Sequence, residues 1–155
     1  MDAIDLKLIT ILQKNARIPL KTLAQQVFLS SPATAARLAH LEKEGIIEGY
    51  SANINLKRVG MPIIAFINLD LDPAQKPTFY PFITAHPHVL ECNCVTGNYS
   101  MLLKVVFPST MELDAFIGQL QQFGRTSTQI VFSTPVQTRG INVNVDVNDI
   151  GNTTE

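Results

Sequence analysis

The sequence has few cysteines, no long hydrophobic run and no recognisable leader. No apolar stretch reaches the roughly 18 residues that a membrane-spanning helix needs. The start, Met1–Asp5, contains no basic region followed by an apolar core, so a signal peptide is not expected. With 155 residues, 46% of them hydrophobic and 16% charged, the composition is that of one globular domain or two small ones. We therefore expect a folded cytoplasmic protein that does not enter a membrane.

The two cysteines, Cys92 and Cys94, are too close in sequence for an easy disulfide bond. At i and i+2 of a strand their side chains point the same way, and the chain between them is too short for an unstrained bridge. The sequence places no set of further Cys or His partners nearby at the spacing of metal ligands. We interpret both as reduced structural thiols and expect neither a metal site nor a cofactor.

Residue patterns for catalysis are also missing. The sequence contains no evident pairing of general acid and base, no nucleophile triad and no phosphate-binding loop. His86 and His88 lie together before a predicted strand, but His86-Pro87-His88 is more simply a polar turn between a helix and a strand. We therefore expect no catalytic residue.

The net charge of −1 is unusual for a nucleic-acid binder, but the charges are unevenly distributed. Residues 1–60 carry eight Lys or Arg and five acidic residues, which gives 8 − 5 = +3. Residues 61–155 carry four basic and eight acidic residues, which gives 4 − 8 = −4. A mildly basic first part and an acidic second part indicate two parts with different roles, although the excess is too modest to identify a DNA-binding protein by itself.

Residues 1–45 show the periodicity of three short helices. Asp2 is in position to cap the first helix, and either Ser30 or Ser31 is in position to cap the third. Gly45 is expected to end the third helix, because glycine readily adopts the left-handed conformation found there.

Period-two patterning over residues 46–54 predicts a short strand or hairpin beside these helices, which makes this part a winged helix-turn-helix domain. Later residues alternate strands, predicted over 63–71, 89–96, 99–107 and 127–136, with helices, predicted over 73–85 and after the capping box of Ser109–Glu112. The order βαββαβ is that of a ferredoxin-like sandwich, so the predicted class is α+β.

The predicted boundaries follow from these elements. They are a DNA-binding domain at 1–54, a linker at 55–62, an effector-binding and oligomerisation domain at 63–140 and a C-terminal tail at 141–155. The tail alternates at period two over 141–148 and is either an additional strand, on this chain or a partner, or a loose end.

Both faces of the predicted sheet carry apolar side chains. One face has Ile63, Ala65, Ile67, Leu90, Met101, Leu103 and Val105, and the other has Ile64, Phe66, Val89, Val95, Leu102 and Val106. A register error of one residue would exchange the two sets. Because the two helices of a ferredoxin-like unit cover only one face, the other is expected to pack on the same sheet of a second copy.

The third predicted helix has the composition that a DNA-recognition helix requires. Its outward face is expected to consist of Ala33, Ala36, Arg37 and His40. Arg37 is expected to reach guanine or phosphate, His40 is a weaker candidate, and Ser31 and Thr34 are expected to bond phosphates near the helix N-terminus. The residues alone also allow a protein-binding module, with Arg37 an ordinary surface arginine and His40 a solvated histidine.

The order of several short motifs resembles the leucine-responsive/asparagine-responsive (Lrp/AsnC) family of transcriptional regulators. The motifs of the first part are Ile4-Asp5, Leu12-Gln13-Lys14-Asn15-Ala16-Arg17, Leu23-Ala24, Leu29-Ser30, Arg37, Leu41-Glu42-Lys43-Glu44-Gly45-Ile46-Ile47 and Gly49-Tyr50. Those of the second part are Val95-Thr96-Gly97-Asn98-Tyr99-Ser100 and Leu102-Leu103-Lys104-Val105. The resemblance covers nearly the whole chain up to about Gly140.

The resemblance implies a bacterial or archaeal regulator that binds double-stranded DNA and forms homodimers, often assembled into octamers. It also implies that an amino acid or a similar small effector binds between dimers, near the loop after the second strand of the second domain. The expected effector-binding residues are Thr96, Gly97, Asn98, Tyr99, Ser100, Ser133 and Thr134.

The sequence departs from the common family pattern in three places. Phe28 stands in the turn where glycine is usual, and a left-handed conformation there would cost on the order of 1 kcal/mol. Ala39 and His40 stand where many members have arginine. The effector loop reads Gly97-Asn98-Tyr99-Ser100 and lacks the two carboxylates of the Gly-Asp-x-Asp form, as in the asparagine-type branch, so a polar amino acid stays possible.

A DNA-binding regulator tuned by a small effector is the leading hypothesis. One alternative is an enzyme, because the same plan resembles haem-precursor (sirohaem) decarboxylases and His86 and His88 could serve such chemistry. Another is a ligand-binding adaptor whose helical part binds protein instead of DNA.

Overall fold

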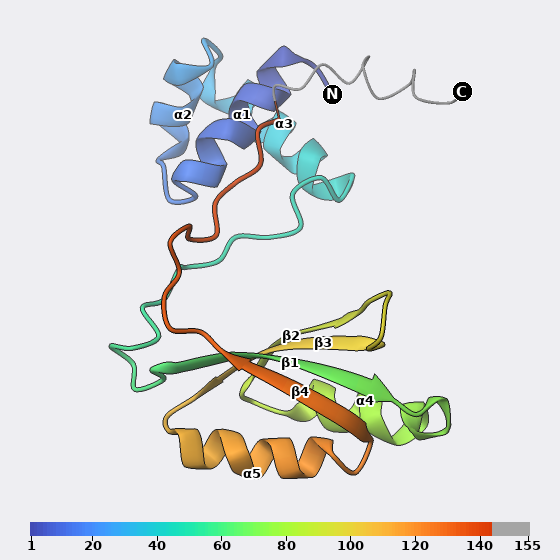
Figure 1. Cartoon of the computed structure of the whole chain (residues 1–155). Helices are drawn as coiled ribbons and strands as arrows, with labels where there is room; N and C mark the ends of the chain where they lie inside the picture. Colours follow the sequence, from blue (N-terminus) through green and yellow to red (C-terminus); the bar gives the residue numbers. More distant parts are fainter. Residues whose placement is uncertain (144–155) are drawn as a thin grey trace, which may run out of the picture. The chain divides into compact units, whose positions relative to one another are not determined.

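The computed structural model describes residues 1–143, which divide into two compact units (Figure 1). Unit 1 comprises Met1–Ala52 and the described residues from Val136 on, and unit 2 comprises Asn53–Pro135. Residues 136–140, which the prediction includes in the second domain, have their contacts mainly with unit 1. None of the helices in residues 1–143 is long and apolar enough to cross a membrane.

Unit 1 contains three helices, α1 (Ala3–Lys14), α2 (Leu20–Gln26) and α3 (Ser31–Lys43). Leu8, Leu23 and Val27 form their buried core. Asp2 caps α1 as predicted, because its carboxylate accepts hydrogen bonds from the backbone N–H groups of Ile4 and Asp5. The Asp5 carboxylate accepts in return from the N–H of Asp2 at 2.9 Å, which completes a capping box.

The α2–α3 turn contains the only non-glycine residue with positive φ in the described chain, Phe28 at 58°. Leu29 N–H donates to the Ala24 carbonyl at 3.0 Å, and Phe28 N–H donates to that of Gln25 at 3.3 Å. This pair of bonds is the Schellman arrangement that usually selects glycine. The structure thus retains the left-handed turn, and the phenylalanine ring is 87% exposed beside Lys7, whose Nζ lies 5.0 Å from the ring centroid.

The end of α3 has the same left-handed backbone conformation, here at a glycine. Gly45 has φ 69°, and the N–H of Ile46 donates to the Leu41 carbonyl at 2.9 Å. Gly45 therefore ends α3 as predicted, and the two helix ends differ mainly in whether a Cβ is present.

The strand or hairpin predicted over residues 46–54 is wrong, since this described segment contains neither. Its period-two pattern has no neighbouring strand to pair with in the described chain, and strand propensity alone does not form a ladder. Tyr50 instead holds the segment beside α3, because its hydroxyl donates to the Glu42 carboxylate at 2.8 Å.

Near the end of the described chain, Gly140 and Ile141 lie against Gln13 of α1. The side-chain amide of Gln13 donates to the Ile141 carbonyl at 3.2 Å, and a Cβ on Gly140 would overlap the Gln13 side chain. Residues 141–143 are not a strand, and the rest of the period-two pattern lies outside the described residues.

Unit 2 has the predicted order βαββαβ. Its elements are β1 (Ile63–Leu71), the short 3-10 helix η1 (Pro73–Gln75), α4 (Lys76–Ala85), β2 (Val89–Cys94), β3 (Met101–Phe107), α5 (Thr110–Leu120) and β4 (Gly124–Ile130). The strands form one antiparallel sheet in the order β2-β3-β1-β4. The last strand begins and ends earlier than predicted, because the chain leaves the sheet after Ile130.

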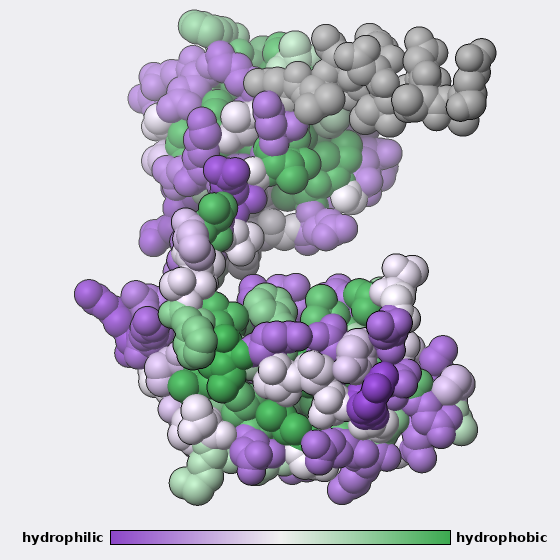
Figure 2. Space-filling view, in the orientation of Figure 1, coloured by the Kyte–Doolittle hydropathy of each residue, from purple (hydrophilic) through white to green (hydrophobic). Residues whose placement is uncertain are grey.

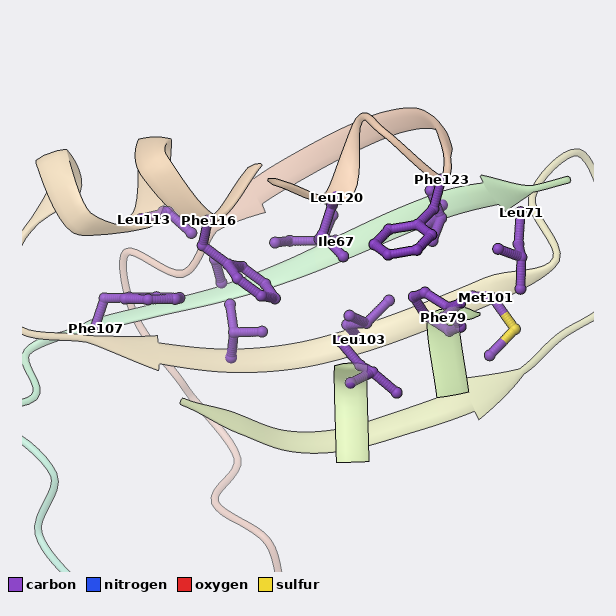
Figure 3. Close-up of a cluster of buried hydrophobic side chains, with 14 residues drawn as sticks. Ile67, Leu71, Phe79, Met101, Leu103, Phe107, Leu113, Phe116, Leu120 and Phe123 are labelled. Atoms are coloured by element: carbon purple, nitrogen blue, oxygen red, sulfur yellow. The ribbon is translucent and has the colours of Figure 1, made fainter. Parts of the chain in front are cut away.

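Both helices lie on the same side of the sheet (Figure 1). The buried cluster between them and the sheet includes Ile67, Leu103, Phe79 and Phe116 (Figure 3). Alternate residues of β1 and β3 face this cluster, as the sequence predicted for Ala65, Ile67, Met101, Leu103 and Val105.

The predicted faces of Val89 and Leu90, at the start of β2, are wrong. Val89 packs against the buried cluster, whereas Leu90 is exposed. A register irregularity lies between Val89 and Glu91, and an extra residue there exchanges the faces.

We predict that Phe28→Gly stabilises unit 1 by about 1 kcal/mol, because glycine removes the Cβ strain of the left-handed conformation. Amide hydrogen exchange in α2 and α3 would measure this local stability. Phe28→Ala is the matched control, since it also removes the ring and its contact with Lys7 but keeps the Cβ. Equal stability of the glycine and alanine variants would show that the turn is not strained.

Candidate DNA-binding and effector-binding surfaces

The exposed face of α3 is nearly uncharged along most of its length. Its exposed residues after the N-terminal proline are Ala33, Ala36, Ala39, His40, Glu42 and Lys43. The three alanines, with His40 and Lys43, follow one helical stripe, which allows close approach to a groove but supplies few hydrogen-bond donors. Of the predicted outward set, Ala33, Ala36 and His40 are exposed, whereas Arg37 is placed differently.

Arg37 faces the start of α1. Its Nη1 lies 2.8 Å from Asp2 Oδ2 and 2.8 Å from Asp5 Oδ1, and its side chain is 33% exposed. The two carboxylates raise the pKa of Arg37. The pKa of Asp2 is lowered first by the backbone N–H of Asp5 and then by the Arg37 guanidinium. The residue predicted as the principal DNA contact therefore joins the two helices within the unit.

Ser31 and Thr34, the two residues predicted to bond phosphates at the α3 N-terminus, differ in exposure. Thr34 is fully buried at 0% exposure, and its hydroxyl donates to the Ser30 carbonyl at 3.0 Å. This burial removes Thr34 from the predicted phosphate contacts. Ser30 is the residue that caps α3, accepting from Ala33 N–H at 3.3 Å, and Ser31 is half-buried in the first turn.

Two exposed lysines of this unit, Lys43 and Lys21, lie outside the predicted set of DNA contacts. Lys43 continues the stripe of His40 by one turn, so extending the helical period to Gly45 would have found it. Lys21 lies in the first turn of α2, the helix that crosses the DNA backbone in a helix-turn-helix. Neither makes an ion pair among those of the described residues.

The predicted effector loop joins β2 to β3. Thr96, Gly97 and Asn98 are exposed, and Tyr99 is half-buried. Val95 N–H donates to the Ser100 carbonyl at 2.9 Å and closes the loop.

Ser100 is bonded to the backbone of β1. Its Oγ accepts from Leu71 N–H at 3.0 Å and donates to the Leu69 carbonyl at 3.4 Å. Its own N–H donates to the same Leu69 carbonyl at 3.1 Å. The hydroxyl predicted to bind effector therefore fixes the loop to the sheet, which leaves Thr96 and Asn98 as the freely accessible polar side chains of the loop.

Ser133 and Thr134 lie far from this loop within one chain. They follow the end of β4, where Ile130 pairs with Ala65 near the start of β1, whereas Ser100 binds near the end of β1. About six strand residues, or roughly 20 Å, separate these positions. One chain does not bring the seven predicted residues together.

Two charged residues beside the loop were not predicted. The Arg125 guanidinium lies 5.3 Å from the centroid of the Tyr99 ring and 4.0 Å from Asp70 Oδ2. Asp70 and Arg125 are paired across β1 and β4, and both side chains are exposed. Only the strand register brings them to the loop, so no local sequence signal would have found them.

His86 and His88 belong to an aromatic cluster at the C-terminal end of α4. The His86 ring centroid lies 4.4 Å from that of Phe116, and the His88 centroid lies 4.7 Å from that of Phe107. Burial, followed by the nearby His88, lowers the pKa of His86. The two residues form the predicted turn before β2, and packing against core phenylalanines accounts for them without catalysis.

Two family models match the chain. The model described as winged helix-turn-helix DNA-binding matches residues 1–48. The model described as the Lrp/AsnC ligand-binding domain matches residues 64–141.

Similar proteins carry names that agree with these models. The uncharacterized HTH-type transcriptional regulator YezC of Bacillus subtilis is 38% identical over 86% of this chain and 94% of its own length. The HTH-type transcriptional regulator LrpA of the same organism is 35% identical over 84% of this chain and 97% of its own length. Both are named as regulators, and neither name denotes an enzyme.

Solved structures share the fold over both units. A transcriptional regulator from Neisseria meningitidis, solved as a complex with L-Met, has a TM-score of 0.87 and 26% identity and covers 93% of this chain and 97% of its own. The structure of Escherichia coli AsnC has a TM-score of 0.81 and 27% identity and covers 92% of this chain and 98% of its own.

We predict that Arg37→Met and Asp5→Asn each destabilise unit 1, and that their double variant loses less than the sum because both remove the same ion pair. The pKa of Asp2 is lower in the folded protein, so its stabilisation is present above its ordinary value of 3.8 and is lost as the pH falls below it. Arg37→Met should make this acid dependence shallower. Hydrogen exchange in α1 and α3 over a pH series measures both effects.

Arg17→Met is the control, since Arg17 is exposed outside the helices. If Arg37→Met were as stable as this control, the ion pairs with Asp2 and Asp5 would contribute nothing to the unit.

Proposed function

Since this chain belongs to the Lrp/AsnC family of transcriptional regulators, we propose that it binds specific double-stranded DNA in the cytoplasm under the control of an amino-acid effector. The observation that carries the proposal is the α3 surface, where three exposed alanines are followed by His40 and Lys43. Small side chains let the helix enter the major groove, while the lysine reaches a phosphate.

A single α3 surface supports only weak binding. Arg37 is engaged by Asp2 and Asp5, so the exposed charge on the stripe is Lys43, with His40 as a further donor. Few phosphate contacts mean a small electrostatic contribution to affinity. Two copies would present two recognition helices to half-sites one helical turn, about 34–36 Å, apart.

The open face of the sheet is the surface that we propose to join two copies. Ile64 pairs with Val106 and Phe66 with Lys104, and these side chains point away from α4 and α5. Glu91 lies 3.3 Å from Lys104 Nζ on the same face. The side of unit 2 that Figure 2 shows mixes apolar and polar residues. A two-fold axis through the open face would bring matching apolar residues together while charges pair at the rim.

The surroundings of the β2–β3 loop support an amino-acid effector. Arg125 and Asp70 place opposite charges beside the loop, and these are the partners that the carboxylate and ammonium groups of a free amino acid need. Asp70 supplies, from β1, a carboxylate of the kind that the loop itself lacks. The similar Neisseria regulator was solved with L-Met, which agrees with this ligand class.

The test of DNA binding is retardation of the chain's own upstream DNA with competitor DNA present. Lys43→Ala should weaken binding and reduce the slope of log affinity against log salt by about 1, because one phosphate contact is lost. His40→Ala should weaken specific binding more than non-specific binding. Lys76→Ala, an exposed lysine of α4, is the matched control and should bind like the parent chain.

Absence of retardation at every salt concentration, with and without amino acids, would contradict the proposal. A Lys43→Ala variant with unchanged affinity and salt slope would move the DNA-binding surface away from this face of α3.

Thermal-shift screening against free amino acids tests the effector site. A ligand specific for the native state raises stability by about 2.7 kcal/mol at 100 times its Kd. Asn98→Ala and Arg125→Gln should abolish the shift, whereas Arg139→Gln, on an exposed residue of unit 1, should retain it. Ser100→Ala should lower the melting temperature without ligand, because its hydroxyl holds the β1 backbone. If Asn98→Ala and Arg125→Gln both kept the full ligand-induced shift in melting temperature, the effector site would lie elsewhere.

A further inference from the structure

Three sulfur-containing side chains, those of Cys92, Cys94 and Met101, lie on the same side of the sheet at its β2 edge. Strand β2 is an edge strand, and its register with β3 places Cys92 opposite Leu103 and Cys94 opposite Met101. Because Leu103 and Met101 face the helices, both cysteines lie on the helix-covered side of the sheet. The sequence alone did not suggest Met101, which comes from the next strand.

Two contacts join Cys94 to its neighbours, and Cys92 lies two residues earlier on the same face of β2. The Cys94 thiol donates to Met101 Sδ at 3.6 Å, and the hydroxyl oxygen of Tyr80, from α4, lies 3.8 Å from Cys94 Sγ. Met101 is only 2% exposed and lies beside Phe79 and Leu71 at one end of the buried cluster (Figure 3). Cys92 is half-buried and Cys94 is exposed, so the cluster has a buried end and an accessible end.

The spacing of the two cysteines is unsuited to a disulfide bond. Strand residues two positions apart have Cβ atoms about 7 Å from each other, whereas a disulfide requires roughly 4 Å. Both cysteines are free in the structure. A metal ion between two sulfurs adds two bonds of about 2.3 Å each, and it therefore spans the gap that a direct S–S bond cannot.

The donor set selects the class of metal. Among the described residues, no group of three or more His, Cys, Asp or Glu side chains is arranged to hold a metal ion. The cluster therefore lacks the four such ligands that a structural zinc site uses. Thiolates and a thioether are soft ligands, which favour Cu(I), an ion that is stable with two or three sulfur ligands. We propose that Cys92, Cys94 and Met101 bind a soft monovalent metal ion of the Cu(I) class.

The site adjoins the β2–β3 loop. Cys94 directly precedes Val95, whose N–H closes the loop by bonding to Ser100. A metal ion on Cys94 would hold the end of β2, so the amide of Val95 should exchange more slowly when the ion is bound. This readout depends on the metal site and not on DNA binding.

The test is anaerobic titration of the full chain with Cu(I) in competition with a chromophoric Cu(I) chelator. We expect one ion per chain, with sulfur neighbours at about 2.3 Å in X-ray absorption. Cys94→Ser should lower the affinity at least roughly 100-fold, and Met101→Leu at least roughly tenfold. Because Cys94 is exposed, its serine variant is expected to fold, and far-UV circular dichroism checks this.

Met111→Leu is the matched control for Met101→Leu, since Met111 is 78% exposed on α5. It should bind Cu(I) like the parent chain, and Tyr80→Phe should do the same because the ring is retained. Parent-like affinity in Cys94→Ser, or a bound ion surrounded only by nitrogen and oxygen, would overturn the proposal.

Discussion

The ion pairs of Arg37 with Asp2 and Asp5 determine how α1 and α3 are joined and which side chains α3 leaves exposed. They join the middle of α3 to the capping box that starts α1, so one guanidinium supports both the helix start and the packing of the two helices. Arg37, the side chain of α3 best suited to binding DNA, is thereby engaged in bonds within the unit. Its exposed surface is left with small residues, His40 and Lys43.

This constraint links the two units in function without requiring any contact between them. A recognition helix with few donors gains affinity when two copies bind adjacent half-sites, because the second helix then binds from a high effective concentration. We propose that unit 2 joins the two copies, since α4 and α5 cover only one face of its sheet and Phe66 and Ile64 lie on the other. We propose that an effector bound at the Arg125–Asp70 pair, beside the β2–β3 loop, alters that assembly.

Local chemistry was predictable from the sequence and long-range pairing was not. The Asp2 cap, the end of α3 at Gly45 and the βαββαβ order follow from signals a few residues long, and the structure confirms them. The ion pairs of Arg37 could not be predicted because its partners lie more than 30 positions away (|i−j| = 32 and 35). Residues 46–54 carried a strand pattern without a partner, and the irregularity near Leu90 exchanged the faces of β2.

The dependence of DNA binding on self-association is tested most directly by analytical ultracentrifugation of the parent chain and of Phe66→Asp, with DNA affinity measured on the same samples. The account predicts that the parent is a dimer or larger at micromolar concentration. It also predicts that a charge on the open sheet face makes the variant monomeric and removes most of its DNA affinity. The account would be contradicted if the parent chain were monomeric and bound its DNA no more tightly than Phe66→Asp does.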